Sequence, residues 1–256
     1  MSSTSASNLP LADRVAVITG ASEGIGRGIA LGLAAAGART VLCGRRVDKL
    51  AEVGAAIESA GGQTETIALD VSDAASVANA ANEVAARHGS IAVLVNSAGY
   101  SIDSPAWDLP SDELDTIVDV GLKGLFLCCQ AFGSLMRESG YGKIINLSST
   151  FAVGTAPGAA AYASVKAAVS HLTQALAVEW GAEGIRVNAI GPTSTLTPSR
   201  AGRRSAEQIR AFEATVPLRR MGTVDDLVPA AVFLASPASD FITGQTLFVD
   251  GGVTAR

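Results

Sequence analysis

The sequence predicts an α/β fold of the Rossmann type, a doubly wound parallel sheet of seven strands with helices on both faces. Two observations favour it. Short β-branched runs alternate with longer amphipathic stretches along the chain, which is typical of a parallel sheet covered on both faces. The 256 residues are 48% hydrophobic, 17% charged and only 5% aromatic, so the chain can bury a large aliphatic core as one domain.

Seven short apolar runs are expected to form the strands of this sheet. They span residues 14–19, 40–43, 66–69, 91–96, 143–148, 186–190 and 246–249. Longer helical stretches separate them, and the clearest are residues 24–36, 111–139 and 159–182. No internal repeat or low-complexity linker divides the chain. We therefore expect a flexible N-terminal tail at residues 1–11, a single domain at 12–256, and a lid at about 193–216 within it.

Composition and charge argue against several classes of protein. The formal net charge is −5, and no basic cluster is interleaved with aromatic residues, so the phosphate backbone of a nucleic acid would be repelled. Residues 1–8 are polar and lack the apolar segment of a signal peptide. No run approaches the length of a membrane span. The chain is expected to act on a small molecule, without nucleic acid or membrane as partner.

The cysteines and histidines predict neither disulfides nor a metal site. Cys43, Cys128 and Cys129 are odd in number and two are adjacent, which favours a reducing cytoplasmic location. We expect all three to be small buried fillers. His88 and His171 match no metal-ligand spacing.

A glycine-rich loop follows the first predicted strand and opens the first predicted helix. Gly20, Gly24 and Gly26 lie in it. Because these residues have no side chains, the backbone can approach a pyrophosphate at the positive end of the helix dipole. Ligands of such sheets bind beyond the carboxyl ends of the strands. Glycines also make ordinary strand-to-helix turns, so the loop alone does not decide the function.

A tyrosine and a lysine supply the chemistry that the loop lacks. Tyr162 and Lys166 stand four residues apart in a run of helix formers, so their side chains project from one helical face. The free phenol has a pKa near about 10, and a neighbouring cation lowers it towards the pH at which a general acid or base works best. Ser149 can offer a hydroxyl to the same substrate oxygen. Read together with the glycine loop, these residues indicate an oxidoreductase.

The order and spacing of these motifs resemble the short-chain dehydrogenase/reductase superfamily, in its single-domain branch of about 250 residues. The resemblance runs almost end to end. It rests on residues 19–26, 70–71, 96–99, 149, 162–166, 188–192 and 244–252. In the family the serine precedes the tyrosine by thirteen positions, which selects Ser149 over Ser148.

The resemblance implies an NAD(P)-dependent alcohol dehydrogenase or carbonyl reductase. In it Tyr162 moves the proton, Ser149 stabilises the developing charge, and Lys166 bonds the ribose and activates the phenol. The residues expected to bind the cofactor are Gly20, Ser22, Glu23, Gly24, Ile25, Gly26, Arg45, Arg46, Asp70, Val71, Asn96, Ala98, Gly99, Tyr162, Lys166, Pro192, Thr193, Thr195 and Thr197. Those expected to bind the substrate are Ser149, Tyr100, Trp107 and Phe151. A small polyol, sugar or ketone fits the compact lid and the mixed apolar and hydroxyl lining.

The end of the second strand indicates which nicotinamide cofactor binds. An acidic residue there would bond the ribose 2′-hydroxyl and repel a 2′-phosphate. The chain instead has Gly44 followed by Arg45 and Arg46, and a guanidinium can hold a phosphate by two parallel hydrogen bonds. This favours NADP(H) over NAD(H). The alternative is a solvated arginine pair, and Glu23 stands where many NADP-using relatives carry a basic residue.

One position departs from the family pattern. Relatives carry an asparagine in a Val-Asn-Leu-Lys-Gly motif that holds a water relaying protons to the lysine, whereas this chain has Gly121 there. A glycine inside a helix also costs about 1 kcal/mol relative to alanine. Another group or extra water completes the relay, or the enzyme is slow, or the position has been altered. Gly121 motivates an alternative function, a catalytically weak NADP(H)-binding relative that acts as a redox-sensing or interaction protein.

Two further expectations concern the lid and the assembly. Arg200, Arg203, Arg204 and Arg210 could attract a carboxylate on the substrate, or could simply face water on a helical lid. By resemblance, the helix that carries Tyr162 and the closing segment 241–249 pack against symmetry mates in a homotetramer.

Overall fold

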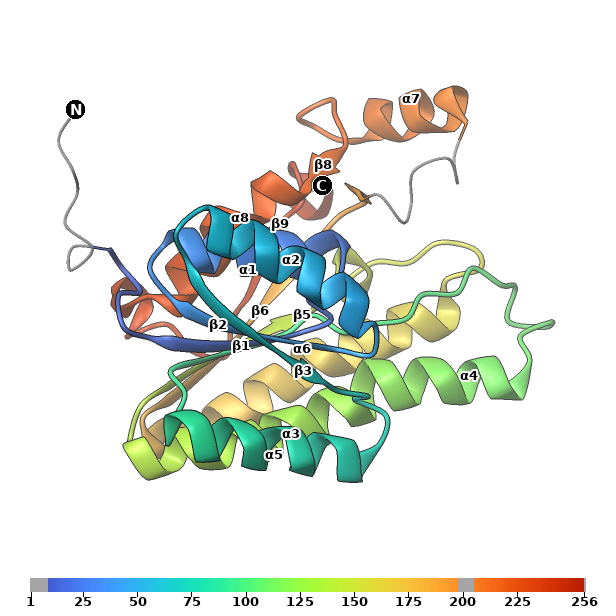
Figure 1. Ribbon diagram of the computed structural model, residues 1–256. Coiled ribbons are helices and arrows are strands. Elements are labelled where there is room, and N and C mark those ends of the chain that lie inside the picture. The colour runs from blue at the N-terminus through green and yellow to red at the C-terminus, as the bar shows by residue number, and fades with distance from the viewer. Residues whose placement is uncertain (1–8, 198–204, 256) are drawn as a thin grey trace, which may run out of the picture.

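A computed structural model describes residues 9–197 and 205–255 of the chain. Its main sheet has the strand order β3-β2-β1-β4-β5-β6-β9, and every neighbouring pair is parallel (Figure 1). The strands are β1 (Val15–Thr19), β2 (Arg39–Gly44), β3 (Gln63–Ala68), β4 (Val93–Asn96), β5 (Gly142–Leu147), β6 (Ile185–Pro192) and β9 (Thr246–Val249). The strand order reverses between β1 and β4, where such sheets bind ligands. The predicted doubly wound sheet of seven strands is confirmed.

Helices cover both faces of this sheet (Figure 1). One layer consists of α1 (Gly24–Ala35), α2 (Val47–Ser59) and α8 (Val224–Ala235). The other consists of α3 (Ala74–His88), α5 (Gly124–Ser139) and α6 (Ala160–Trp180). Along β1, Ala16 and Ile18 pack in the core beneath the first layer, whereas Val17 packs in the core beneath the second. This alternation explains why the strand reads as a continuous apolar run.

The cysteines lie in these cores, as the sequence predicted. Cys43 on β2 and Cys128 and Cys129 on α5 are free and buried. Burial raises the pKa of the Cys128 thiol to about 12, so this thiol is protonated and unreactive near neutral pH.

The helix expected over residues 111–139 is interrupted. It consists of α4 (Ser111–Val118), a π-helical turn at Asp119–Lys123, and α5. By length and composition alone this 29-residue stretch could cross a membrane, which corrects the expectation that no run approaches such a length. Phe132 and Met136 on α5 are completely buried against the sheet. This burial identifies α5 as a core helix of the fold.

The first helix layer contains a close contact between α1 and α8. A β-carbon at Gly28 would overlap the side chain of Val224, and one at Gly32 would overlap that of Val228. Glycine therefore lets the two helices approach each other at both positions.

The strands depart from the expected ranges by at most three residues, at the start of β3, and the tail and the lid differ as well. Residues 1–8 of the predicted tail lie outside the described residues, but Leu11 is fully buried and its N–H donates to the Ala36 carbonyl at 3.0 Å. The segment of the predicted lid begins with β7 (Thr195–Leu196), which pairs in parallel with β8 (Gly222–Thr223). This two-stranded sheet was not predicted, because its strands are too short to show a pattern.

The lid helix α7 (Ala206–Thr215) stands away from the main sheet (Figure 1). It carries no buried residue, and a capping box between Ser205 and Gln208 begins it. Of the four lid arginines, Arg210 lies on α7, whereas Arg200, Arg203 and Arg204 lie outside the described residues.

Candidate active site

The glycine loop forms a narrow backbone turn at the carboxyl end of β1. Gly20 and Gly24 have φ angles of 66° and 58°, in the left-handed region that favours glycine. A β-carbon at Gly26 would overlap the Gly20 carbonyl oxygen. Glu23 is the N-cap of α1 and its side chain makes no capping hydrogen bond to the first turn. The N–H groups at this helix end therefore suit a pyrophosphate, and the loop fits a dinucleotide.

The loop packs against the segment that follows β4. The Thr19 hydroxyl oxygen accepts hydrogen bonds from the N–H groups of Ser97 and Ala98, both at 3.2 Å. A β-carbon at Gly20 would lie only 2.7 Å from the Ala98 nitrogen. The predicted cofactor residues Gly20 and Ala98 are thus brought together.

The segment after β6 also lies close to the glycine loop. A β-carbon at Gly24 would lie 3.6 Å from Cγ2 of Thr197. Pro192 ends β6, and Thr195 is buried, with its hydroxyl donating to the Thr193 carbonyl at 2.9 Å. Residues 192–197 and the loop therefore border the same region beyond the carboxyl ends of β1 and β6.

Asn96 is placed differently from the other predicted cofactor residues. Its side chain is buried and donates to Asn146 Oδ1 at 2.9 Å and to Cys129 Sγ at 3.2 Å. The Asn146 side chain in turn donates to the Thr173 hydroxyl at 3.0 Å. This amide network ties β4 and β5 to α5 and α6, so Asn96 supports the site from within the core. Sequence reasoning missed Asn146 and Thr173, although an asparagine at the end of each adjacent strand was a readable signal.

Asp70 and Arg45 lie at the carboxyl ends of the adjacent strands β3 and β2. Asp70 Oδ1 accepts hydrogen bonds from the Ser72 hydroxyl at 2.7 Å and from its N–H at 3.0 Å. These bonds, with a smaller contribution from the positive charge of Arg45, hold the pKa of Asp70 below its usual value. Val71, the next residue of the predicted cofactor set, is buried.

The Ser149, Tyr162 and Lys166 side chains lie where α6 packs against the end of β5 and the short turn that follows it. Lys166 is buried, donates from Nζ to the Leu147 carbonyl at 2.6 Å, and lies 5.7 Å from the ring centroid of Tyr162. Ser149 is also buried and its Oγ accepts the Phe151 N–H at 3.1 Å. The bond to Leu147 fixes the ammonium beneath the half-buried phenol.

The adjacent serine has a structural role. The Ser148 hydroxyl donates to the Lys166 carbonyl at 3.1 Å and lies 2.7 Å from Ser170 Oγ. It therefore holds β5 to α6, whereas Ser149 begins the short 3-10 turn Thr150–Ala152. The catalytic role of Ser149 rather than Ser148 stays a prediction.

The predicted substrate residues do not all lie together. The Phe151 ring packs edge-on against the Tyr162 ring, with centroids 6.1 Å apart. Tyr100 donates to Glu113 Oε2 at 2.6 Å, and this bond raises the pKa of the Tyr100 phenol. Trp107 is 98% exposed on the loop before α4. Phe151 is therefore beside the phenol, whereas Trp107 faces outward.

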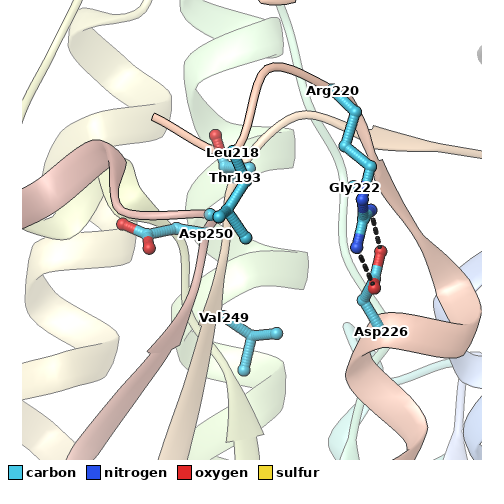
Figure 2. Close-up of a pocket in the computed structure, with 8 residues that line it drawn as sticks. Thr193, Leu218, Arg220, Gly222, Asp226, Val249 and Asp250 are labelled. Atoms are coloured by element: carbon cyan, nitrogen blue, oxygen red, sulfur yellow. Dashed lines mark hydrogen bonds and ion pairs between the residues drawn. The ribbon is translucent and has the colours of Figure 1, made fainter. Parts of the chain in front are cut away.

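A cavity of about 130 Å³ lies between the root of the lid and the ends of β6 and β9 (Figure 2). Thr193 and Asp250 border it on one side. On the other side Arg220 makes two contacts of 2.6 Å with the Asp226 carboxylate, which holds the pKa of that carboxyl well below its usual range. Asp226 also accepts the N–H and hydroxyl of Thr223, so it ties Arg220, in the segment after α7, to the start of α8.

The comparisons with known proteins agree with this geometry. A family model described as enoyl-(acyl carrier protein) reductase matches residues 20–254. D-threitol dehydrogenase of Mycolicibacterium smegmatis is 39% identical over 95% of this chain and 94% of its own length. The chain belongs to the short-chain dehydrogenase/reductase family.

Two further members of the short-chain family extend the similarity. Gluconate 5-dehydrogenase of Gluconobacter oxydans is 35% identical over 93% of this chain and 94% of its own. The crystal structure of a gluconate 5-dehydrogenase from Burkholderia cenocepacia, in complex with NADP and tartrate, is 37% identical and has a TM-score of 0.93. That similarity covers 98% of this chain and 99% of the other.

Gly121, where this short-chain dehydrogenase/reductase departs from the family pattern, is buried in the π-helical turn. A β-carbon there would lie 2.8 Å from Cγ1 of Val165, the residue before Lys166. Val165 is β-branched and therefore stiff at χ1. The glycine thus makes room for Val165 in the contact between this turn and α6.

Replacing a glycine inside a helix usually raises stability, but this contact makes the replacement of Gly121 destabilising. Gly121→Asn should lower stability by about 1–3 kcal/mol through overpacking, and should lower the turnover number because Lys166 is displaced with Val165. Thermal melting and steady-state rates measure both effects. The additional substitution Val165→Ala should relieve the overlap and recover part of the loss. If Gly121→Asn alone were both more stable and faster, the missing asparagine amide would have left the proton relay incomplete.

Proposed function

We propose that the chain is an NADP(H)-dependent alcohol dehydrogenase or carbonyl reductase acting on a small polyol, sugar or ketone. The observation that carries the proposal is the Tyr162 phenol near the Lys166 ammonium, which the Leu147 carbonyl holds, at the same carboxyl edge of the sheet as the glycine loop. Ser149 at the end of β5 supplies the third group. A protein that only bound the cofactor would not need the phenol.

The relatives support the substrate class. The names of the threitol and gluconate 5-dehydrogenases describe oxidoreductases of a polyol and a sugar acid. This supports an oxidoreductase of alcohol or sugar substrates. The Phe151 ring packs edge-on against the Tyr162 ring, and we expect it to border the substrate beside the phenol.

In the proposed mechanism, each of the three side chains has one role. The bound nicotinamide supplies or accepts a hydride at its C4 atom. In reduction, the Tyr162 hydroxyl donates its proton to the carbonyl oxygen, and Ser149 donates a hydrogen bond that stabilises the charge developing there. The Lys166 ammonium would stabilise the phenolate that Tyr162 becomes and would bond the ribose hydroxyls of the cofactor. In oxidation, Tyr162 acts as the base.

The proposed cofactor is NADP(H), held along the carboxyl edge of the sheet. The N-terminus of α1 would face the pyrophosphate, and Asp70 with Val71 would frame the adenine. Arg45 and Arg46 lie at the end of β2, where they would face the 2′-phosphate. Thr193, Thr195 and Thr197 would lie along the nicotinamide half. The relative crystallised with NADP supports this cofactor.

An absorbance assay of the reduced nicotinamide tests the function. The purified protein is incubated with a panel of small polyols, sugars and alcohols and either NADP⁺ or NAD⁺, and then with ketones and NADPH or NADH. We expect turnover with at least one small polyol, sugar or ketone. Turnover should be faster with NADP(H) than with NAD(H). Tight NADPH binding without turnover of any substrate would favour the redox-sensing or interaction role.

We also propose that the chain assembles as a cytoplasmic homotetramer. Val178 on α6 and Phe241 before β9 are 85% and 105% exposed, and Leu247 on β9 is 40% exposed. β9 is an edge strand of the main sheet, and an apolar edge of this kind is commonly covered by a partner. Light scattering at micromolar concentration should give the mass of four chains, and a monomeric mass would refute the assembly.

A further inference from the structure

Arg46 reaches back from the start of α2 to the glycine loop. Its Nη2 donates to Ser22 Oγ at 2.9 Å and forms an ion pair with Glu23 Oε1 at 3.0 Å. Both charged side chains are about half exposed, at 50% and 46%. The end of β2 and the loop after β1 are thus joined by an ion pair at the surface.

This ion pair occupies the guanidinium that the proposed function assigns to the 2′-phosphate. The phosphate would replace the Glu23 carboxylate at Arg46, because both are anions that seek the same donors. The carboxylate would remain near a phosphate that carries up to two negative charges. Exposed ion pairs are weak, so the exchange is possible, but it lowers the net gain from binding the phosphate.

Arg45 has a different neighbourhood. Its charge acts on Asp70, which is already fixed by the Ser72 hydroxyl. Arg46 is therefore the arginine of the two whose guanidinium is engaged by the glycine loop itself.

We propose that Glu23 determines cofactor specificity by competing with the 2′-phosphate for Arg46. In the absence of that phosphate, Glu23 neutralises Arg46, so NAD(H) is also accepted. When NADP(H) binds, the pair opens and part of the phosphate affinity is lost. This inference rests on the proposed function, because it requires a nicotinamide dinucleotide bound at the glycine loop.

Binding measurements on Glu23→Gln test the competition without relying on activity. The ligands are NADPH and NADH, titrated by nucleotide fluorescence, and 2′,5′-ADP and 5′-AMP, titrated by calorimetry. We expect Glu23→Gln to tighten NADPH and 2′,5′-ADP roughly threefold to tenfold, from the lost competition and repulsion. NADH and AMP should change less than about twofold, since they lack the phosphate.

Glu52→Gln is the matched control. Glu52 is exposed on α2 and pairs with Lys49 at 2.6 Å, so its substitution removes the same charge without touching Arg46. It should leave all four affinities unchanged. In an Arg46→Ala background, the gain from Glu23→Gln should shrink, because only the direct repulsion remains.

The outcomes separate the inference from the function on which it rests. Equal tightening of the nucleotides with and without the 2′-phosphate, or no change in any affinity, would overturn the competition while leaving the dinucleotide site intact. Failure of the unsubstituted protein to bind either NADPH or NADH would overturn the proposed function itself. Selective tightening that shrinks without Arg46 would establish Glu23 as the competitor.

Discussion

Tyr162→Phe should reduce turnover by roughly 10²–10⁴-fold, the usual contribution of a positioned general acid or base. The substitution removes the proton donor but keeps the ring that packs edge-on against Phe151. Lys166 is held by the Leu147 carbonyl and therefore keeps its place. Steady-state rates with the best substrate of the panel measure the loss, and NADPH affinity should remain within about twofold because the hydroxyl acts on substrate.

Tyr141→Phe provides the control for this substitution. Tyr141 precedes β5 at the opposite edge of the sheet, and its hydroxyl donates to Asp240 at 3.2 Å. Removing that hydroxyl should leave turnover unchanged. Appreciable turnover by Tyr162→Phe would exclude the phenol as the proton carrier.

Gly32→Ala should destabilise the protein, by about 1–3 kcal/mol, although the same change stabilises most helices. Gly32 lies inside α1, where alanine ordinarily gains about 1 kcal/mol from its lower backbone entropy. Here the added methyl group would overlap the Val228 side chain on α8. The two helices must then separate, and α1 carries the glycine loop at its N-terminus. Urea unfolding measures the change in the free energy of unfolding.

Gly54→Ala is the matched control for helix propensity. Gly54 lies inside α2, and a β-carbon there would meet Thr64 Cγ2 at 3.6 Å, an ordinary contact. It should raise the free energy of unfolding by up to about 1 kcal/mol. A second variant, Gly32→Ala with Val228→Ala, should recover part of the stability lost in the single variant. If Gly32→Ala stabilised as much as Gly54→Ala, the close contact of α1 with α8 would not limit stability.

The sheet could be predicted because each of its strands is marked by residues that are close together in the sequence. Strands buried on both faces read as continuous apolar runs, and the motifs mark their carboxyl ends. The β7–β8 pair could not be read in this way, because two residues in each strand show no period. The π-helical turn was missed for another reason. Gly121 within it faces Val165, which lies on a different helix and far along the chain, so no local pattern marks the turn.

In the candidate site, too, local sequence predicts the positions of residues but not the contacts of their side chains. Local pattern placed Ser148 and Ser149 at the end of β5 and Lys166 on α6, and the structure shows Ser148 bonded to α6. The direction of a side chain depends on its neighbours in space. The Asn96 side chain therefore lies in the core, bonded to Asn146, and Trp107 is exposed. The pairing of Arg46 with the glycine loop could likewise not be predicted, because it depends on the parallel pairing of β1 with β2.

The most direct test of the central claim follows the hydride itself. The polyol or sugar that reacts fastest in the panel is prepared with deuterium at its carbinol carbon and incubated with the protein and NADP⁺. Hydride transfer predicts that the reduced cofactor gains the deuterium on C4 of its nicotinamide ring, as seen by mass spectrometry and NMR, and that Tyr162→Phe forms almost none of it. Reduced cofactor without deuterium, or product formed without reduced cofactor, would contradict the proposed dehydrogenase.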